Sequence, residues 1–137
     1  NMGLRYKGGS SARMVLRNWG DTSHGYHLDG KSHIGFSSDI GSATTGTSCT
    51  KATSITVSST ETEGNDLCNA AQYEVWKRHS MRFFGYKCEE PVRMYQDNMS
   101  TIWLARNDGS FLRTKHIVIR KYYLRERLEA GDITLIY

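Results

Sequence analysis

The spacing of apolar and polar residues changes period several times along the chain, and each change predicts a new element of secondary structure. Strand-like patterns, in which apolar and polar side chains alternate, occur at residues 14–21, 32–40, 53–58, 92–96 and 133–137. Apolar residues at helical spacing predict a long helix over 61–79, a short helix from residue 98 and a basic helix over 117–130. The Gly- and Thr-rich stretch 41–47 is predicted to be a loop. This order of elements predicts an α/β fold in which helices pack on a mixed sheet.

The composition of the chain is that of one mildly basic domain. Its 137 residues include 18 Lys and Arg against 14 Asp and Glu, and the net charge of +4 is compatible with a polyanionic partner. The three cysteines are widely spaced and form no C-x-x-C pair, so neither a disulfide framework nor a zinc ribbon is indicated. No apolar run approaches the roughly 20 residues of a membrane span, so no membrane partner is expected. We expect residues 1–13 to be a linker or edge segment and residues 14–137 to be the folded domain.

Three acidic residues stand at the ends of predicted elements. Asp21 ends the first strand, Asp97 ends the fourth, and Glu63 begins the long helix. Converging carboxylates repel one another and favour hard divalent cations such as Mg²⁺, and two such ions can clamp the attacking water and the leaving oxygen of a phosphodiester. Each acid also has a structural interpretation, since Thr60 and Glu63 form an S/T-x-x-E capping box and the two aspartates suit a turn and a cap. The spacing alone leaves both interpretations open.

Four motifs, in order along the chain, resemble the ribonuclease H domain of copia-type LTR retrotransposon Pol polyproteins, the domain that follows the reverse transcriptase. They are D-T-S-H-G with D-G-K-S-H-I-G-F (21–25 and 29–36), S-S-T-E-T-E (58–63), Y-Q-D-N-M-S (95–100) and R-T-K-H-I-V-I-R (113–120). Together they cover nearly the whole chain. The resemblance implies a ribonuclease H-like fold, with a mixed sheet and helices packed on its faces. It also implies metal-dependent, endonucleolytic hydrolysis of RNA in RNA–DNA hybrids during reverse transcription.

By this resemblance Asp21, Glu63 and Asp97 are the first three catalytic carboxylates and the ligands of Mg²⁺, with Mn²⁺ as an alternative. The family's fourth carboxylate comes from a P-T-x-x-Q-x-A-D segment after the final strand, and this chain stops at Tyr137. We therefore expect a fragment of a longer protein that lacks the final helix and cleaves hybrid slowly or not at all. Loss of that helix is also expected to expose apolar residues near Ile133 and Leu135.

A basic segment near the end of the chain is the candidate nucleic-acid-binding surface. Arg113, Lys115, His116 and Arg120 lie in the motif R-T-K-H-I-V-I-R, where cations can follow a phosphate backbone. The alternative is a solvated amphipathic helix with Leu124 turned inward, and both can hold at once. His116 is equally well explained as a structural, hydrogen-bonded residue.

The remaining expectations concern partners, location and rival functions. The resemblance implies an RNA–DNA hybrid and the reverse transcriptase domain of the same polyprotein as partners, and the cytoplasm, in a virus-like particle, or the nucleus as location. The rival function is that of a non-catalytic nucleic-acid-binding or structural remnant of a retroelement. His24 and His27 have a weak zinc-like spacing without further ligands, so no zinc site is expected there. Trp19, Trp76 and Trp103 are expected to be core or partly buried aromatics.

Overall fold

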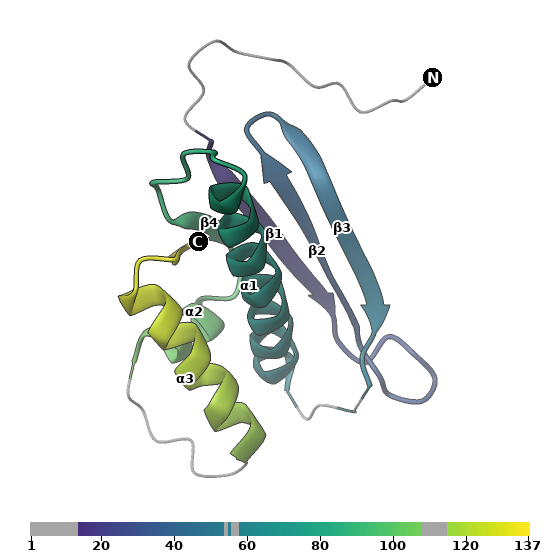
Figure 1. Ribbon diagram of the computed structural model, residues 1–137. Helices are drawn as coiled ribbons and strands as arrows, with labels where there is room; N and C mark the ends of the chain where they lie inside the picture. Colours follow the sequence, from purple (N-terminus) through teal and green to yellow (C-terminus); the bar gives the residue numbers. More distant parts are fainter. Residues whose placement is uncertain (1–13, 54, 56–57, 108–114) are drawn as a thin grey trace, which may run out of the picture.

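The computed structural model describes residues 14–53, 55, 58–107 and 115–137, with the backbone alone for 115–117 (Figure 1). The linker expected over residues 1–13 lies outside the described residues. The elements are β1 (Leu16–Ser23), β2 (His33–Ile40), β3 (Ala43–Lys51), α1 (Ser59–Phe83), β4 (Val92–Tyr95), α2 (Met99–Arg106), α3 (Lys115–Glu129) and β5 (Ile133–Ile136).

The described strands form one mixed sheet in the order β3-β2-β1-β4-β5. Strands β1, β2 and β3 pair antiparallel, whereas β4 pairs parallel with both β1 and β5. Parallel neighbours need a crossover connection, and α1 supplies it between β1 and β4, while α2 and α3 lie between β4 and β5. The predicted α/β class with a mixed sheet is confirmed.

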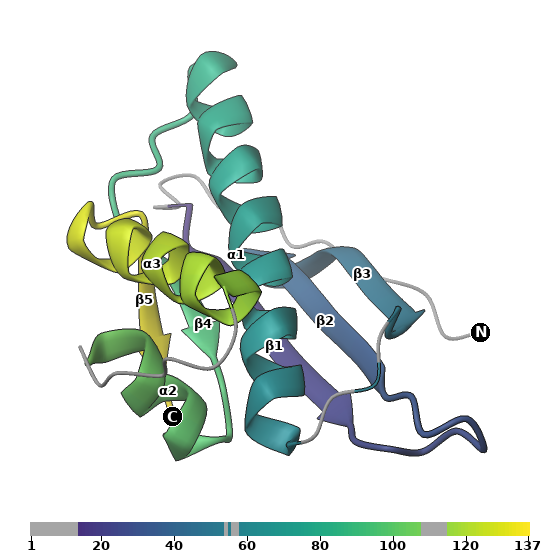
Figure 2. The same ribbon diagram turned by 90° about the horizontal axis from the view of Figure 1, so that it is seen from below.

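The described helices cover one face of this sheet. Helix α1 packs on β1 and β2, α3 contacts α1 and β5, and α2 packs against α1 and α3 (Figures 1 and 2). In β4 and β5 every second residue is buried, which places a single apolar layer under the helices. Helices on both faces were expected, and within the described part of the chain the opposite face is uncovered.

The core that the helices cover includes two residues expected to be exposed. Ile133 and Leu135 are only 2% and 3% exposed, and they belong to the same buried cluster as Leu124 of α3. The expectation of an apolar surface there is wrong, because these residues point to the helix-covered side of β5.

The third strand is not where the sequence predicted it. It spans Ala43–Lys51, across the stretch expected to be a loop, while Thr53 and Ile55 lie outside any strand and the rest of 53–58 is largely outside the described residues. Gly41 adopts a φ of +61°, which suits the first position of a two-residue hairpin turn directly after β2. Since threonine favours strands despite its polarity, the run after this turn continues as an edge strand.

Helix α1 is longer than predicted and begins earlier. Its N-cap is Ser58, whose Oγ accepts a hydrogen bond from the Glu61 backbone N–H at 3.2 Å, so the capping pair is Ser58 and Glu61 rather than Thr60 and Glu63. The helix ends at Phe83, and Gly85, with a φ of +85°, is the predicted stop. This shift of the cap releases the Glu63 side chain from a capping role.

Polar side chains tie α1 to the sheet and to the turn before β5. Glu74, fully buried, accepts a hydrogen bond from Asn18 Nδ2 at 3.0 Å and pairs with Lys77 at 3.1 Å. Further along the helix, Arg78 pairs with Asp132 at 2.7 Å. Buried ions need such partners, so these contacts hold α1 in one position over β1.

None of the three tryptophans lies in the core, so of the two expectations only that of partial burial remains. Trp76 and Trp103 are 64% and 54% exposed, so the expectation of core positions is wrong for both. Trp19 is 39% exposed and stacks on Tyr95 across the uncovered face. Among the residues that the structure describes, no helix combines the length and the apolar character that a bilayer span requires.

Candidate active site at the ends of β1 and β4 and the start of α1

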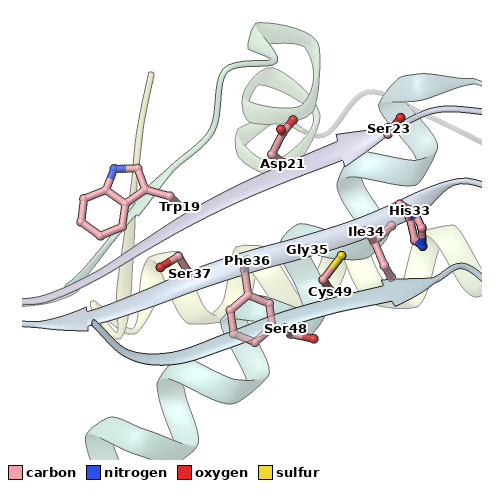
Figure 3. A pocket seen from close by; sticks show the side chains of 10 residues that line it. All are labelled: Trp19, Asp21, Ser23, His33, Ile34, Gly35, Phe36, Ser37, Ser48 and Cys49. Atoms are coloured by element: carbon pink, nitrogen blue, oxygen red, sulfur yellow. The ribbon is translucent and has the colours of Figure 1, made fainter. Parts of the chain in front are cut away.

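Asp21 lies on β1, on the face of the sheet that the helices leave uncovered. It is exposed and pairs in register with Gly35 of β2. With Trp19 and His33 it lines an open hollow of about 410 Å³, and Figure 3 shows its carboxylate projecting from β1 on the side away from β2 and β3. Strand β1 continues two residues beyond the predicted end at Asp21, so the acid lies within the strand rather than after it.

Asp97 follows β4 at the end of the sheet where the C-terminal ends of β1 and β4 lie side by side. Trp19 and Tyr95 are Cα partners on the parallel strands β1 and β4, and the two aspartates each come two residues later. Since side chains alternate with a period of two along extended chain, this register directs Asp97 to the side of the sheet that carries Asp21. Asn98 then caps α2, because its Oδ1 accepts hydrogen bonds from the backbone N–H groups of Ser100 and Thr101 at 2.9 and 3.2 Å.

Glu63 comes from the first turns of α1 and is half-buried. Burial raises the pKa of its carboxyl group, and the negative charges of Asp97 and Asp21 raise it further, while a hydrogen bond from Asn98 and the nearby His24 lower it. Acids from three separate segments therefore act on one another electrostatically. The capping alternative for Glu63 does not hold, since Ser58 and Glu61 perform that role.

Asp66 is a fourth acid at this place, and the sequence analysis missed it. It follows Glu63 by three residues on α1 and is 2% exposed. Its burial, together with the charges of Asp21 and Glu63, raises the pKa of its carboxyl group to about 7. The available signal was its position three residues after Glu63, which puts both acids on neighbouring turns of one helix face.

The side chains present are of the type that binds a hard divalent cation. Glu63 Oε2 and Asp66 Oδ2 are buried oxygens without a hydrogen-bond partner in the described part of the chain, and carboxylate oxygens are the ligands that Mg²⁺ and Mn²⁺ prefer. The described residues contain no group of three His, Cys, Asp or Glu already gathered closely enough to hold a metal ion. Asp21, Glu63 and Asp97 are therefore not gathered as a metal site in this structure, and their role as ligands stays a prediction.

Histidines border the acids without forming a zinc site with one another. His24 Nδ1 lies 3.3 Å from Thr62 Oγ1 at the start of α1, which places its ring beside Glu63. His27 instead has its Nε2 3.3 Å from Nε2 of His33. The two histidines of the His-x-x-His pattern thus have different partners.

Only one residue of the predicted nucleic-acid-binding set can be placed. Arg113 lies outside the described residues, as do the side chains of Lys115 and His116 in the first turn of α3. Arg120 is exposed and lines a cavity of about 850 Å³ between the start of α1, α2 and α3. The binding role of this segment stays a prediction.

Comparison with known proteins identifies similar sequences among transposon polyproteins. No protein-family model matches the chain. The chain is 26% identical over 80 residues to the retrovirus-related Pol polyprotein from transposon RE1 of Arabidopsis thaliana, and 25% identical over 80 residues to that from transposon RE2 of the same plant. Each alignment spans 58% of this chain and 6% of the polyprotein, so the chain corresponds to a small part of these relatives. The chain is therefore similar to a segment of retrotransposon Pol polyproteins.

Proposed function

We propose that the chain is ribonuclease H sequence from a retrotransposon Pol polyprotein and acts in divalent-cation-dependent hydrolysis of the RNA strand of RNA–DNA hybrids. The observation that carries the proposal is the parallel register of β1 and β4, which brings Asp21 and Asp97 to one end of the sheet near Glu63 of α1. There, burial and then the charges of both aspartates raise the pKa of the Glu63 carboxyl group. The mixed five-stranded sheet with its helices is compatible with a ribonuclease H-like fold. Similarity to Pol polyproteins supports the same assignment.

In this proposal Asp21, Glu63 and Asp97 hold the cation, and their neighbours orient them. Asn98, held by its hydrogen bonds to the start of α2, donates to Glu63 and thereby restrains that carboxylate. Bound Mg²⁺ or Mn²⁺ supplies positive charge that lowers the pKa of a water molecule and stabilises the leaving 3′ oxygen. His24, beside Thr62, is a further neighbour that lowers the pKa of Glu63.

The proposed nucleic-acid contacts come from the basic segment. Arg113, Lys115, His116 and Arg120 are assigned to phosphates of the hybrid, and the 2′-hydroxyl groups mark the RNA strand as the one to be cut. Other domains of the same polyprotein, including the reverse transcriptase, are the proposed protein partners. The proposed location is the cytoplasm, in a virus-like particle, or the nucleus.

The test is hydrolysis of a labelled RNA strand in an RNA–DNA hybrid, with RNA duplex and DNA duplex as controls. We expect products from the hybrid alone, in Mg²⁺ or Mn²⁺ and not in EDTA, formed slowly if at all by the unmodified chain and faster by a chain extended with a P-T-x-x-Q-x-A-D segment. Asp97→Asn should lower the rate by on the order of 100-fold or more, the scale on which loss of one electrostatic stabiliser acts. Asp29 lies in the β1–β2 connection and pairs with Lys51, the last residue of β3, at 2.8 Å. The variant Asp29→Asn removes one negative charge away from the acids of the site, so it is the charge-matched control and should cleave at the rate of the unmodified chain. Hybrid binding without cleavage in either metal, both by the unmodified chain and by a chain extended with a P-T-x-x-Q-x-A-D segment, would overturn the proposal and favour a non-catalytic remnant.

A further inference from the structure

We propose that Asp66 is an additional oxygen ligand for the divalent cation held by Asp21 and Glu63, and that it approaches from the interface between β1 and α1. The inference rests on the cation site of the proposed function and adds to it a residue that neither the motifs nor the comparisons identify. Three observations carry it: the burial of Asp66, a second orphaned oxygen on the same helix face, and the contact of its carboxylate with β1.

The first observation is that Asp66 is buried without compensation. Its side chain is 2% exposed, and Oδ2 has no hydrogen-bond partner among the described residues. Buried polar atoms in native proteins almost always have a partner, and buried carboxylates are paired with cations or coordinate metals. Elsewhere on α1 the equally buried Glu74 also has an oxygen without a hydrogen bond, Oε2, but that oxygen pairs with the Lys77 ammonium at 3.1 Å and Oε1 accepts from Asn18. The contrast within one helix is that the buried Glu74 has a cation beside it, whereas no ion pair is found for Asp66 among the described residues.

The second observation is that three of the five buried oxygens that lack a hydrogen-bond partner among the described residues lie near one another, while Asp39 Oδ1 and Glu74 Oε2 lie elsewhere. Glu63 Oε2, one helical turn before Asp66, is also buried and without a partner in the described part of the chain. Residues three apart on a helix are surface neighbours with Cβ atoms roughly 5–6 Å apart. Thr22, the residue after Asp21 near the end of β1, contributes a third buried oxygen, Oγ1, without a hydrogen-bond partner in the part of the chain that the structure describes. Oxygen-rich surroundings of this type suit a hard cation rather than a thiol- or imidazole-binding metal.

The third observation is a close approach to β1. A Cβ atom added to Gly20 would lie 3.1 Å from Asp66 Oδ2, so the carboxylate packs directly on the strand backbone next to Asp21. The absence of a side chain at residue 20 leaves the space that the carboxylate uses. The charges of Asp21 and Glu63 both act on Asp66, which agrees with this placement. Asp66 thus lies one helical turn after Glu63 and packs on β1 at the residue before Asp21, and because Asp21 projects from the opposite face of the sheet, a shared cation requires the side chains to turn toward one another beyond the end of the strand.

If Asp66 is a cation ligand, Asp66→Asn should change how tightly the chain binds Mn²⁺. If Asp66 has only a structural role, the affinity for Mn²⁺ should stay the same. Asparagine keeps the size and one oxygen but removes the negative charge, so it relieves the buried charge in the metal-free chain. The measurements are Mn²⁺ binding by calorimetry and the Mn²⁺-dependent rise in the melting temperature at pH 8, neither of which needs catalysis. If Asp66 is a ligand, Asp66→Asn should bind Mn²⁺ about 10- to 100-fold more weakly, while its metal-free melting temperature should equal or exceed that of the unmodified chain. Asp29→Asn should change neither quantity.

Mn²⁺ affinity of Asp66→Asn equal to that of the unmodified chain would overturn the inference and leave Asp21, Glu63 and Asp97 as the proposed site. Weakened Mn²⁺ binding in a chain that cleaves no hybrid would sustain the inference while the proposed function fails. Should Asp66→Asn fail to fold, the unmodified chain decides: the ¹³C shift of the Asp66 carboxyl should move on Mg²⁺ titration together with that of Glu63. A stationary Asp66 signal alongside a moving Glu63 signal would overturn the inference, as would absence of any Mg²⁺ or Mn²⁺ binding.

Discussion

Trp19 and Tyr95 stack on the uncovered face of the sheet, with ring centroids 5.2 Å apart and ring planes within 7° of parallel. They are Cα partners across the parallel strands β1 and β4. The chain between the two strands contains β2, β3 and α1, so no short turn fixes their register and contacts between them have to set it. The stack provides such a contact two residues before Asp21 and Asp97, and it thereby aligns the two carboxylates.

The first prediction concerns this stack. Trp19→Ala and Tyr95→Ala should each lower the free energy of unfolding, and the double variant should lose less than the sum. We expect a coupling of about 0.5–1.5 kcal/mol, the range measured for aromatic pairs beyond their buried area. Urea unfolding of the four proteins in a double-mutant cycle measures it. Strictly additive losses would show that the rings do not stabilise one another, and Trp76→Ala, an exposed tryptophan on α1, is the control for loss of an indole.

A second prediction concerns the buried pair of Glu74 and Lys77. Lys77 is only 6% exposed, and Glu74→Gln leaves its ammonium group without the paired carboxylate. This change should lower the free energy of unfolding by about 3–5 kcal/mol. Replacing both by apolar residues, Glu74→Leu with Lys77→Met, should cost much less than the two single changes together. The cycle is again measured by urea unfolding at pH 7.

Equal or greater loss in the double variant would contradict the assignment of the penalty to an unpaired charge. Part of the loss would remain in any case, because Asn18 Nδ2 donates to Glu74 and loses its acceptor in the double variant. Asn18→Ala in the double-variant background isolates that part.

How far the fold could be predicted depended on how strongly each strand is buried on one side. β4 and β5 alternate buried and half-buried residues, and their predicted positions agree with the structure to within a residue or so. β3 contains one buried residue, Ala43, among polar ones, so no apolar period marks it. Its position depends on pairing with β2, a tertiary relationship that local pattern cannot express.

The candidate site shows the same limit. Asp21 and Asp97 could be identified because acids at strand ends are visible in the sequence, and the parallel pairing of β1 with β4 then brings those ends to one edge. Asp66 could not be identified, because its significance depends on packing against Gly20, 46 residues earlier in the chain. The helix cap was also displaced by two residues, since Ser58 and Thr60 both begin an S/T-x-x-E pattern and only the structure decides between them.

The third prediction concerns the basic segment. Neutralising Arg113, Lys115 and Arg120 together should weaken hybrid binding. It should also reduce the slope of log affinity against log salt concentration by up to about three, because each phosphate contact releases roughly one counterion. Fluorescence anisotropy of a labelled hybrid, titrated at salt concentrations from about 50 to about 300 mM, measures this slope. Lys87→Gln is the control, since Lys87 is an exposed cation beyond the far end of α1. An unchanged slope in the triple variant would assign the segment to a solvated helix face.

The last prediction concerns pH and the metal-free chain. The pKa of Asp66 is raised to about 7 in the folded chain from an ordinary value of 3.8, so the folded state holds this proton more tightly than the unfolded state does. Stability is therefore greatest below the unfolded pKa and declines as pH rises toward 7, after which the full cost of the buried charge is present. Each pKa unit corresponds to about 1.4 kcal/mol, which makes the cost up to about 4 kcal/mol at pH 8. Asp66→Asn carries no charge at any pH and should gain on the unmodified chain steadily as pH rises from about 5 to 8.

Urea unfolding in EDTA across this range measures the difference between the two proteins. Asp29→Asn is the matched control, because a hydrogen bond from Lys51 lowers the pKa of Asp29, and both its folded and unfolded states are ionised throughout the window. Its stability should therefore run parallel to that of the unmodified chain. A difference between Asp66→Asn and the unmodified chain that stays constant with pH would show that Asp66 is not buried as a titrating acid. Saturating Mn²⁺ should reverse the order at pH 8, because a bound cation stabilises the ionised carboxylate that the metal-free chain buries at a cost.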